Sequence, residues 1–271
     1  LHLTQLTLSR QLIQLEGELG VKLFRRSQHH IVLTDAGMLL RRRAQEIVDL
    51  AERTAQELQP GEEIAGKISI GSGDLRSMSF LAELMGAFQR TYPQVRYELY
   101  SGDSDGIKER IERGLLDLGL LVEPVEISRY EILRLPVRER WGVFVREDSP
   151  LAARERVTPE DLVNVPLIFS ARERMQQEIV RWFGPRAEQI RLAASGNLPY
   201  NLTQLCRQGM GVFLSIELDQ SCPGVRFVPL SPALESGTVL AWKKTETFSP
   251  ATDAFLQFAQ KYVNRMTEHP G

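Results

Sequence analysis

Few residues in this chain could do acid–base, nucleophilic or metal chemistry. The sequence has four histidines: His2, His29, His30 and His269. None lies between residues 31 and 268, so a Ser-His-Asp triad or a histidine-ligated metal is excluded there. Residues 71–73 (GSG) begin like a dinucleotide-binding loop, but Arg76 stands where the third glycine is needed. We predict that the chain is not an enzyme and uses no metal or cofactor.

Sulfur and carboxylate chemistry are equally unpromising. Cys206 and Cys222 have a spacing that matches neither a redox motif nor a zinc knuckle, and we expect both to be buried apolar side chains. Asp103 and Asp105 form a carboxylate pair of the kind found on solvated loops. The chain has no membrane-length apolar run and no signal-peptide pattern, so we expect a cytoplasmic protein.

Charge is distributed unevenly along the chain, although the net value is only −2. Residues 1–45 carry seven Lys or Arg against three acidic residues, and the remaining residues are net acidic. A basic segment on an acidic body indicates that the segment meets a polyanion and the body does not. A solvated basic face is the other interpretation of the same charges.

The first part of the basic segment has the pattern of a helix. Thr4 is a suitable N-cap, Leu8, Leu12, Leu15 and Leu19 recur at helical spacing, and Gly20 ends the run. The other side chains are hydroxyls, amides and one guanidinium: Gln5, Thr7, Ser9, Arg10 and Gln14. These are the groups that contact base edges and phosphates in the major groove of DNA.

A hairpin and a long helix follow. Two short apolar runs, 21–24 and 31–33, flank a basic turn and predict a two-stranded wing. Thr34 is the expected N-cap of a helix that runs to Pro60. Its apolar stripe is narrow and long, which favours pairing with a second chain.

These residues resemble the winged helix-turn-helix of the LysR-type transcriptional regulators. The resemblance rests on residues 4–12 (TQLTLSRQL), 18–26 (ELGVKLFRR) and 33–37 (LTDAG). It implies DNA contacts from the helix and the wing: Gln5, Thr7, Ser9, Arg10, Arg26 and His30. The family usually has proline where this chain has Leu6. The family's first helix and most of its second would precede Leu1, so we expect a chain truncated within the DNA-binding domain.

The pattern changes after residues 60–66, which are rich in glycine and charge. From Lys67 onward, short apolar runs alternate with helical periods, which predicts an α/β fold with a mainly parallel sheet. The motifs resemble the two-lobed, periplasmic-binding-protein-like effector domain of the same family: residues 70–71 (IG), 92–93 (YP), 117–119 (DLG), 148–152 (DSPLA) and 209–211 (GMG).

The resemblance implies four segments. Residues 1–36 form a partial DNA-binding domain, 37–59 a linker and dimerisation helix, 60–66 a hinge, and 67–271 the effector domain. Within the effector domain, the resemblance implies a first lobe of about 67–143 and 244–271 and a second of about 144–243, with two crossing strands as the hinge between them. The family is typically a tetramer, and we expect a homodimer or homotetramer.

Ligands of open α/β sheets bind beyond the carboxyl ends of the strands, so the residues that follow the strands are candidates. In the first lobe these are Ser72, Gly73, Asp74, Ser77, Ser101, Gly102, Asp103 and Glu123. In the second lobe they are Ser170, Arg172, Asn197, Tyr200 and Asn201. Arg172 could pair with a carboxylate, although serine, aspartate and asparagine at these positions also serve as helix caps. Leu75 stands where many family members carry an effector-binding hydroxyl.

Two functions remain open at this point. The first is an effector-responsive regulator that binds operator DNA and a small molecule. The second is a two-lobed small-molecule receptor whose DNA-binding segment does not function. Salt-dependent binding to duplex DNA distinguishes them, and the composition of residues 1–45 favours the regulator.

Overall fold

The computed structural model describes residues 5–26, 31–57, 64–125, 128–219, 222–245 and 247–268. The chain divides into two compact units, residues 1–60 and 61–271. No helix in the described ranges combines the length and the apolar character that crossing a membrane requires.

The first unit contains two helices and a hairpin. Helix α1 spans Gln5–Leu19, β1 Phe24–Arg26, β2 Ile31–Leu33 and α2 Asp35–Glu57. Gly20, with φ of 67°, follows α1, as expected. The strands pair antiparallel with Phe24 opposite Leu33, which confirms the predicted hairpin. Thr4 lies outside the described residues.

A tight junction joins the hairpin to α2. The Thr34 hydroxyl accepts the backbone N–H of Gly37 at 3.0 Å, so it caps α2 as predicted. It also donates to the carbonyl of Lys22 at 2.6 Å. Gly37 packs so closely on the Leu23 carbonyl that any Cβ there would collide with backbone. Glycine at this position is therefore required for the hairpin to contact the helix.

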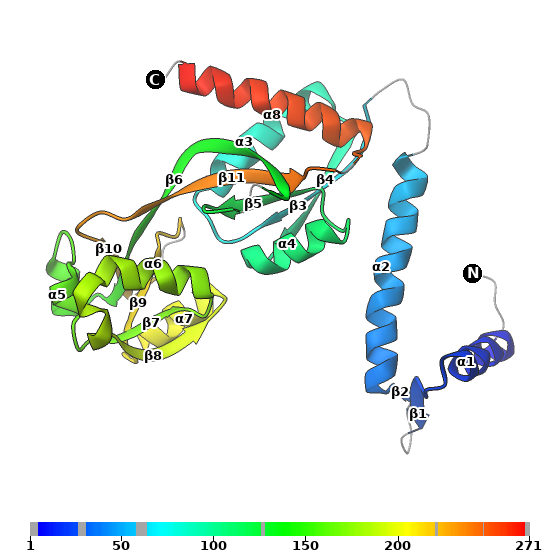
Figure 1. Ribbon diagram of the computed structural model, residues 1–271, viewed down its shortest axis with the longest axis horizontal. Helices are drawn as coiled ribbons and strands as arrows, with labels where there is room; N and C mark the ends of the chain where they lie inside the picture. The colour runs from blue at the N-terminus through cyan, green and yellow to red at the C-terminus, as the bar shows by residue number, and fades with distance from the viewer. Residues whose placement is uncertain are drawn as a thin grey trace. The chain divides into compact units, whose positions relative to one another are not determined.

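The second unit has two lobes joined by long strands (Figure 1). The first lobe contains β3 (Gly66–Ser72), α3 (Ser77–Thr91), β4 (Val95–Ser101), α4 (Ser104–Glu112), β5 (Leu118–Val122) and the C-terminal α8 (Pro250–Glu268). The second lobe contains α5 (Pro159–Leu162), β7 (Pro166–Ser170), α6 (Glu173–Phe183), β8 (Arg191–Gly196), α7 (Pro199–Arg207), β9 (Val212–Ile216) and β10 (Val225–Pro229), with short 3-10 helices at Pro150–Ala153 and Gly184–Gln189. Strands β6 (Tyr130–Arg146) and β11 (Glu235–Lys243) complete the fold.

The described strands of this unit follow the order β4-β3-β5-β11-β6-β9-β7-β8, and β10 also pairs with β6. Strand β3 runs parallel to β4 and β5, and β7 runs parallel to β8 and β9. The central pairings of β11 and β6 are antiparallel. The expectation of a mainly parallel sheet was therefore wrong, because a strand that crosses between lobes and returns must run against its neighbours.

Strand β11 also corrects the expected lobe division. We expected residues 235–243 in the second lobe, but β11 pairs with β5 of the first lobe, with Leu240 opposite Leu120. Strand β6 serves both lobes, because Tyr130–Arg140 pair with β11 and the residues from Trp141 onward pair with β9. A single apolar run carries no mark of which sheet it joins, so the sequence pattern could not show this.

Helices cover both faces of each half-sheet, and the alternation of side chains along the strands fills a core on each face. In β5, Leu118 and Leu120 pack with α3 and α8, and Leu121 packs with α4. In β9, Leu214 packs towards Phe183 of α6, and Phe213 packs towards α7. Each lobe thus has its own hydrophobic core, and the strand ends face the space between the lobes.

Candidate functional site

Two adjoining cavities lie between the lobes of the second unit. The first, which we call the strand-end cavity, has a volume of about 110 Å³ and is lined from both lobes. It brings together eight of the predicted residues: Gly73, Asp74, Ser101, Gly102, Asp103, Ser170, Arg172 and Asn197. Residues that follow β3, β4, β7 and β8 therefore meet, as expected for an open α/β sheet.

The second cavity, which we call the β4-side cavity, is larger, at about 350 Å³. It includes the predicted residues Ser72 and Tyr200. It shares Gly73, Asp74, Leu75 and Ser101 with the strand-end cavity, so the two adjoin along these residues.

Arg172 is the cation of the strand-end cavity that is best placed to meet an anion. It precedes α6, and its side chain is 20% exposed. Its Nε is buried and, among the described residues, has no hydrogen-bond partner. The Nε lies 4.0 Å from Asp105 Oδ2 of α4, which is an ion-pair distance across the lobes. A donor in this state costs free energy until an acceptor reaches it.

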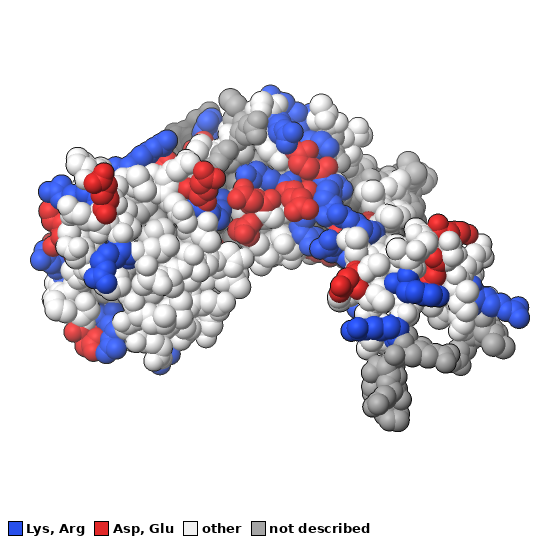
Figure 2. Space-filling view, turned by 60° about the horizontal axis from the view of Figure 1, so that its bottom comes forward, with Lys and Arg blue, Asp and Glu red and all other residues white. Residues whose placement is uncertain are grey.

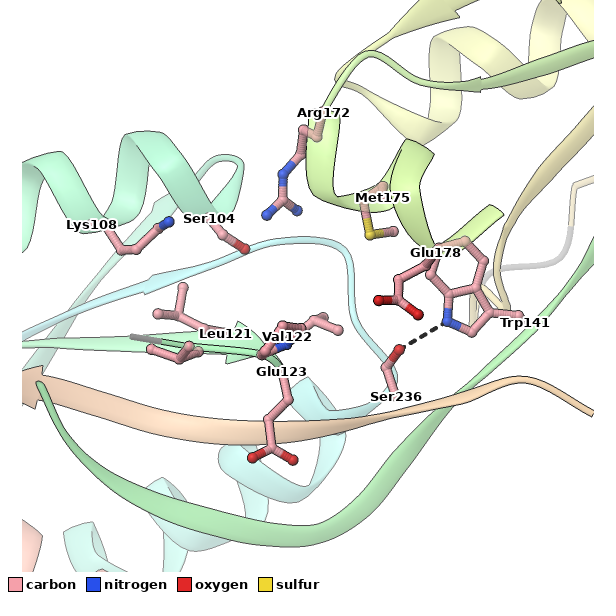
Figure 3. A pocket seen from close by; sticks show the side chains of 12 residues that line it. Ser104, Lys108, Leu121, Val122, Glu123, Trp141, Arg172, Met175, Glu178 and Ser236 are labelled. Carbon is pink, nitrogen blue, oxygen red and sulfur yellow. Dashed lines mark hydrogen bonds between the residues drawn. The ribbon is translucent and has the colours of Figure 1, made fainter. Parts of the chain in front are cut away.

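Arg172 also borders a third, much smaller cavity (Figure 3). In Figure 3 its guanidinium extends from the α6 side towards Ser104 and Lys108 of α4. The volume is about 30 Å³, which is room for a water molecule or two rather than an effector. The indole N–H of Trp141 donates to the Ser236 hydroxyl at 2.9 Å and closes one side.

Three predicted residues do not line the two larger cavities. Glu123 lies at the smallest cavity and accepts a hydrogen bond from Arg134 Nε at 3.0 Å. Ser77 is fully buried at the start of α3, and Asn201 is exposed on α7. Serine and asparagine at helix starts often have structural roles, which is why position after a strand did not separate them from the cavity residues.

Gly102 and Asp103 have structural reasons for their identities. A Cβ at Gly102 would lie 2.7 Å from Cε1 of Tyr100, so a larger residue would have to displace that ring. The Asp103 carboxylate accepts the backbone N–H of Gly106 at 2.8 Å and caps α4. Both residues line the cavity while fixing the turn between β4 and α4.

The structure adds a charge network between the lobes that the sequence pattern did not reveal. Glu139 of β6 is fully buried and accepts the backbone N–H groups of Arg76 and Ser77, at 3.2 and 3.0 Å. The Arg76 guanidinium reaches Glu217 at 2.7 Å and Asp219 at 3.2 Å, both beyond β9 of the second lobe. The start of α3 is thereby joined to the second lobe.

The two cysteines differ in how deeply they are buried. Cys206 is buried as predicted, its thiol donates to the Phe144 carbonyl at 3.1 Å, and burial raises the pKa of that thiol. Cys222 is only half-buried and lines the β4-side cavity, which differs from the expectation. Among the described residues, no group of three His, Cys, Asp or Glu side chains could hold a metal ion.

The predicted DNA-binding residues stand on α1 and the hairpin. Thr7, Ser9 and Arg10 are exposed near the start of α1, and no acidic residue occurs in its first turn. Gln5 opens the helix and Arg26 ends β1. His30 lies outside the described residues.

Figure 2 shows charged side chains crowded on the first lobe of the other unit and sparse over the visible face of the second lobe.

Comparisons with known proteins agree with this arrangement. Residues 61–264 match the family described as LysR substrate binding domain, and residues 1–38 match the bacterial regulatory helix-turn-helix protein, lysR family. The chain is 27% identical over 267 residues to the uncharacterized HTH-type transcriptional regulator YybE of Bacillus subtilis (strain 168), an alignment that covers 95% of this chain and 89% of that protein.

Two solved structures share the fold. Full-length CbnR complexed with its target DNA has a TM-score of 0.73 at 19% identity, covering 96% of this chain and 91% of CbnR. The effector binding domain of QuiR in complex with shikimate has a TM-score of 0.66 at 20% identity, covering 74% of this chain and 98% of that domain. The match of residues 61–264 spans most of the sequence, so the chain belongs to the LysR family of transcriptional regulators rather than to a class of enzymes.

Proposed function

We propose that this regulator contacts operator DNA through the N-terminal part of α1 and the β1–β2 hairpin, and that it binds a small anionic effector in the strand-end cavity. The observation that carries the effector site is Arg172, which lines the strand-end cavity and whose buried Nε has no hydrogen-bond partner among the described residues. Since bacterial DNA lies in the cytoplasm, the protein acts there.

The DNA-binding part of the proposal rests on chemistry and exposure. Arg10 is an exposed guanidinium within a stretch of hydroxyl and amide side chains, and a guanidinium can bind a guanine edge or a phosphate. Arg25 and Arg26 belong to β1, in the hairpin that follows α1, and they add two positive charges to the same unit of the chain. Binding through these cations releases counterions, so affinity should fall steeply with salt.

The first test is the Arg10→Ala variant of the full chain. A binding sequence is first selected from a random duplex library with the unaltered protein. Affinity for that duplex, measured by fluorescence anisotropy, should then fall by about 1–3 kcal/mol in the variant, with weaker discrimination against mismatched sites. Arg181→Ala removes an exposed arginine of α6 and should leave DNA affinity unchanged. Equal affinity for Arg10→Ala and the unaltered protein would contradict the assignment.

The effector part of the proposal rests on the residues around Arg172. Ser170 and Asn197 line the same cavity and can donate hydrogen bonds to a second oxygen of a bound anion. QuiR, whose effector domain shares this fold, binds shikimate, which is a small carboxylate. We infer that the effector of this protein also carries a carboxylate or a similar anionic group.

The second test uses Arg172→Met, which keeps much of the side-chain volume and removes the charge. A panel of small carboxylates that includes shikimate is screened by calorimetry against the full chain. A carboxylate that binds the unaltered protein should bind the variant about tenfold to a hundredfold more weakly, because a charge-assisted hydrogen bond contributes about 1.5–3 kcal/mol. Arg181→Met serves as the control. Unchanged affinity in Arg172→Met would exclude Arg172 from the site.

Effector binding must then act on DNA through a change of conformation. The ion pair between Arg172 and Asp105 spans the lobes. An anion that binds Arg172 therefore alters a contact between the two lobes. The effector can shift the lobe angle only by binding one arrangement more tightly than the other. Two heads paired through α2 would convert that shift into a change in how two half-sites are held.

A further inference from the structure

The size of the strand-end cavity sets a limit on what it can hold alone. Its volume of about 110 Å³ is well below the roughly 300–1,000 Å³ of sites that enclose small molecules. The β4-side cavity adds about 350 Å³ and adjoins it along Gly73, Asp74, Leu75 and Ser101. Together the two cavities have the size of a small-molecule site with two compartments.

The walls of the β4-side cavity are largely apolar. Aliphatic and thioether side chains come from α3, β4 and their neighbours, and two tyrosine rings complete the wall: Leu75, Met78, Leu99, Leu218, Tyr100 and Tyr200. Leu99 is 52% exposed and Tyr200 is 64% exposed, so apolar surface meets solvent here. The Arg110 guanidinium lies 4.0 Å from the centre of the Tyr100 ring and holds that ring in place.

The described linings of the two compartments differ in their cations. Arg172 lines the strand-end cavity but not the β4-side cavity. Asp74 lines both cavities, Asp103 lines the strand-end cavity, where its carboxylate caps α4, and Asp219, which is paired with Arg76, lines the β4-side cavity. An anionic head is therefore favoured close to Arg172, where it meets a cation, and the described lining of the β4-side cavity offers it no cation. Leu75 borders both compartments and gives their shared wall an apolar side chain.

We propose that the effector is an amphipathic carboxylic acid whose carboxylate binds at Arg172 and whose hydrocarbon arm occupies the β4-side cavity. The inference rests on the proposed function, because it places the head of the effector in the strand-end cavity. It adds the chemical class of the rest of the molecule. Leu99, Met78 and Tyr200 then select for the length of the arm.

The experiment measures the binding of straight-chain alkanoates, from acetate to decanoate, to the full chain by calorimetry. Affinity should rise about fourfold for each methylene group, the factor expected when a methylene leaves water for an apolar wall, and should level off once the cavity is full. Affinity that does not depend on chain length would overturn the proposal, and so would the absence of binding by every member of the series.

Two variants test the position of the arm. Leu99→Asp places a carboxylate in the wall of the β4-side cavity, and Ser79→Trp fills the cavity with an indole. Both should abolish the dependence on chain length. Leu192→Asp is the matched control, since Leu192 is 53% exposed, also lies on an edge strand and lines neither cavity. It should bind the series like the unaltered protein.

The outcomes separate this inference from the proposed function. If Arg172→Met weakens every alkanoate while Leu99→Asp and Ser79→Trp change nothing, the effector head stays at Arg172 and the arm does not lie in the β4-side cavity. Sedimentation measures the mass of the assembly in solution. If Leu99→Asp alone among these variants lowers that mass, a second copy of the chain covers the cavity and the proposal is overturned. The DNA measurements with Arg10→Ala are independent of both results.

Discussion

At the scale of single residues, Glu139 shows how a charged side chain can be part of the core. Its carboxylate is fully buried on β6 and accepts two backbone N–H groups at the start of α3. Those N–H groups have no partner within the helix, and the helix dipole favours a negative charge there. Arg76, which follows the cavity residues 73–75, is thus held in position through its backbone.

We predict that Glu139→Ala destabilises the second unit markedly. It leaves two buried N–H donors without an acceptor, and each such donor costs about 1–3 kcal/mol. Glu139→Gln keeps one carbonyl acceptor and should cost less. Urea denaturation measures the free energies of unfolding. Glu131→Ala, on the exposed side of the same strand, is the control and should change little. A Glu139→Ala protein as stable as that control would contradict the role of Glu139.

At the scale of elements, α2 exposes an apolar stripe that its own unit does not cover. Ile47 is 68% exposed, and Leu40, seven residues before it, lies on the same side of the helix. An apolar stripe on a helix of this length is stabilised when a second helix covers it. We therefore propose that α2 pairs two copies of the chain.

We predict that Ile47→Glu weakens this pairing, because it places a charge in the apolar stripe. Sedimentation should show a lower mass at a given concentration, and DNA affinity should fall with it because two heads no longer bind together. Gln45→Glu adds the same charge on the opposite side of the helix, two residues away, and should leave the mass unchanged. If the two variants behave alike, α2 is not the element that pairs the chains.

At the scale of the whole molecule, carboxylates in both units depend on the folded state. Hydrogen bonding by Lys22 and by the backbone of Leu23 lowers the pKa of Glu16 in the first unit. Arg146 lowers the pKa of Asp148 in the second unit, with Nε at 2.8 Å from Oδ1. The pKa of Glu160 is also lowered, mainly by a hydrogen bond from its own backbone.

A lowered pKa makes the folded state bind protons less readily than the unfolded state. The stabilisation is complete above the unfolded pKa values, which are about 4, and is lost as the pH falls through the folded values. We predict that the urea concentration at the unfolding midpoint is nearly constant from pH 7 to about pH 5. It should decrease when the pH is lowered beyond about pH 4.

Asp148→Asn tests the origin of this pH dependence. The midpoint of the variant should lie slightly below that of the unaltered protein at neutral pH, because the ion pair with Arg146 is exposed and screened. The difference should shrink as the pH falls, since the unaltered Asp148 then becomes protonated. Glu131→Gln should show no such convergence. A difference that stays the same at every pH would exclude the ion pair as its cause.

The sequence by itself determined the local elements and the residues at their ends. Periodicity predicted α1 and α2, Thr34 acts as the predicted N-cap, and Gly20 follows the end of α1 as predicted. Most of the predicted cavity residues, including Ser170, Arg172 and Asn197, do meet between the lobes. These features depend on local chemistry and on a rule of parallel sheets that needs no contact map.

Only the tertiary structure decided which strands pair with each other and which polar side chains are held by hydrogen bonds within the fold. The pairing of β11 with β5, the burial of Glu139 and the diversion of Glu123 to Arg134 all depend on partners far away in the sequence. The β4-side cavity is likewise assembled from α3, β4, α7 and the residues after β9. A contact between distant residues leaves no periodic trace along the chain, so composition and spacing could not show it.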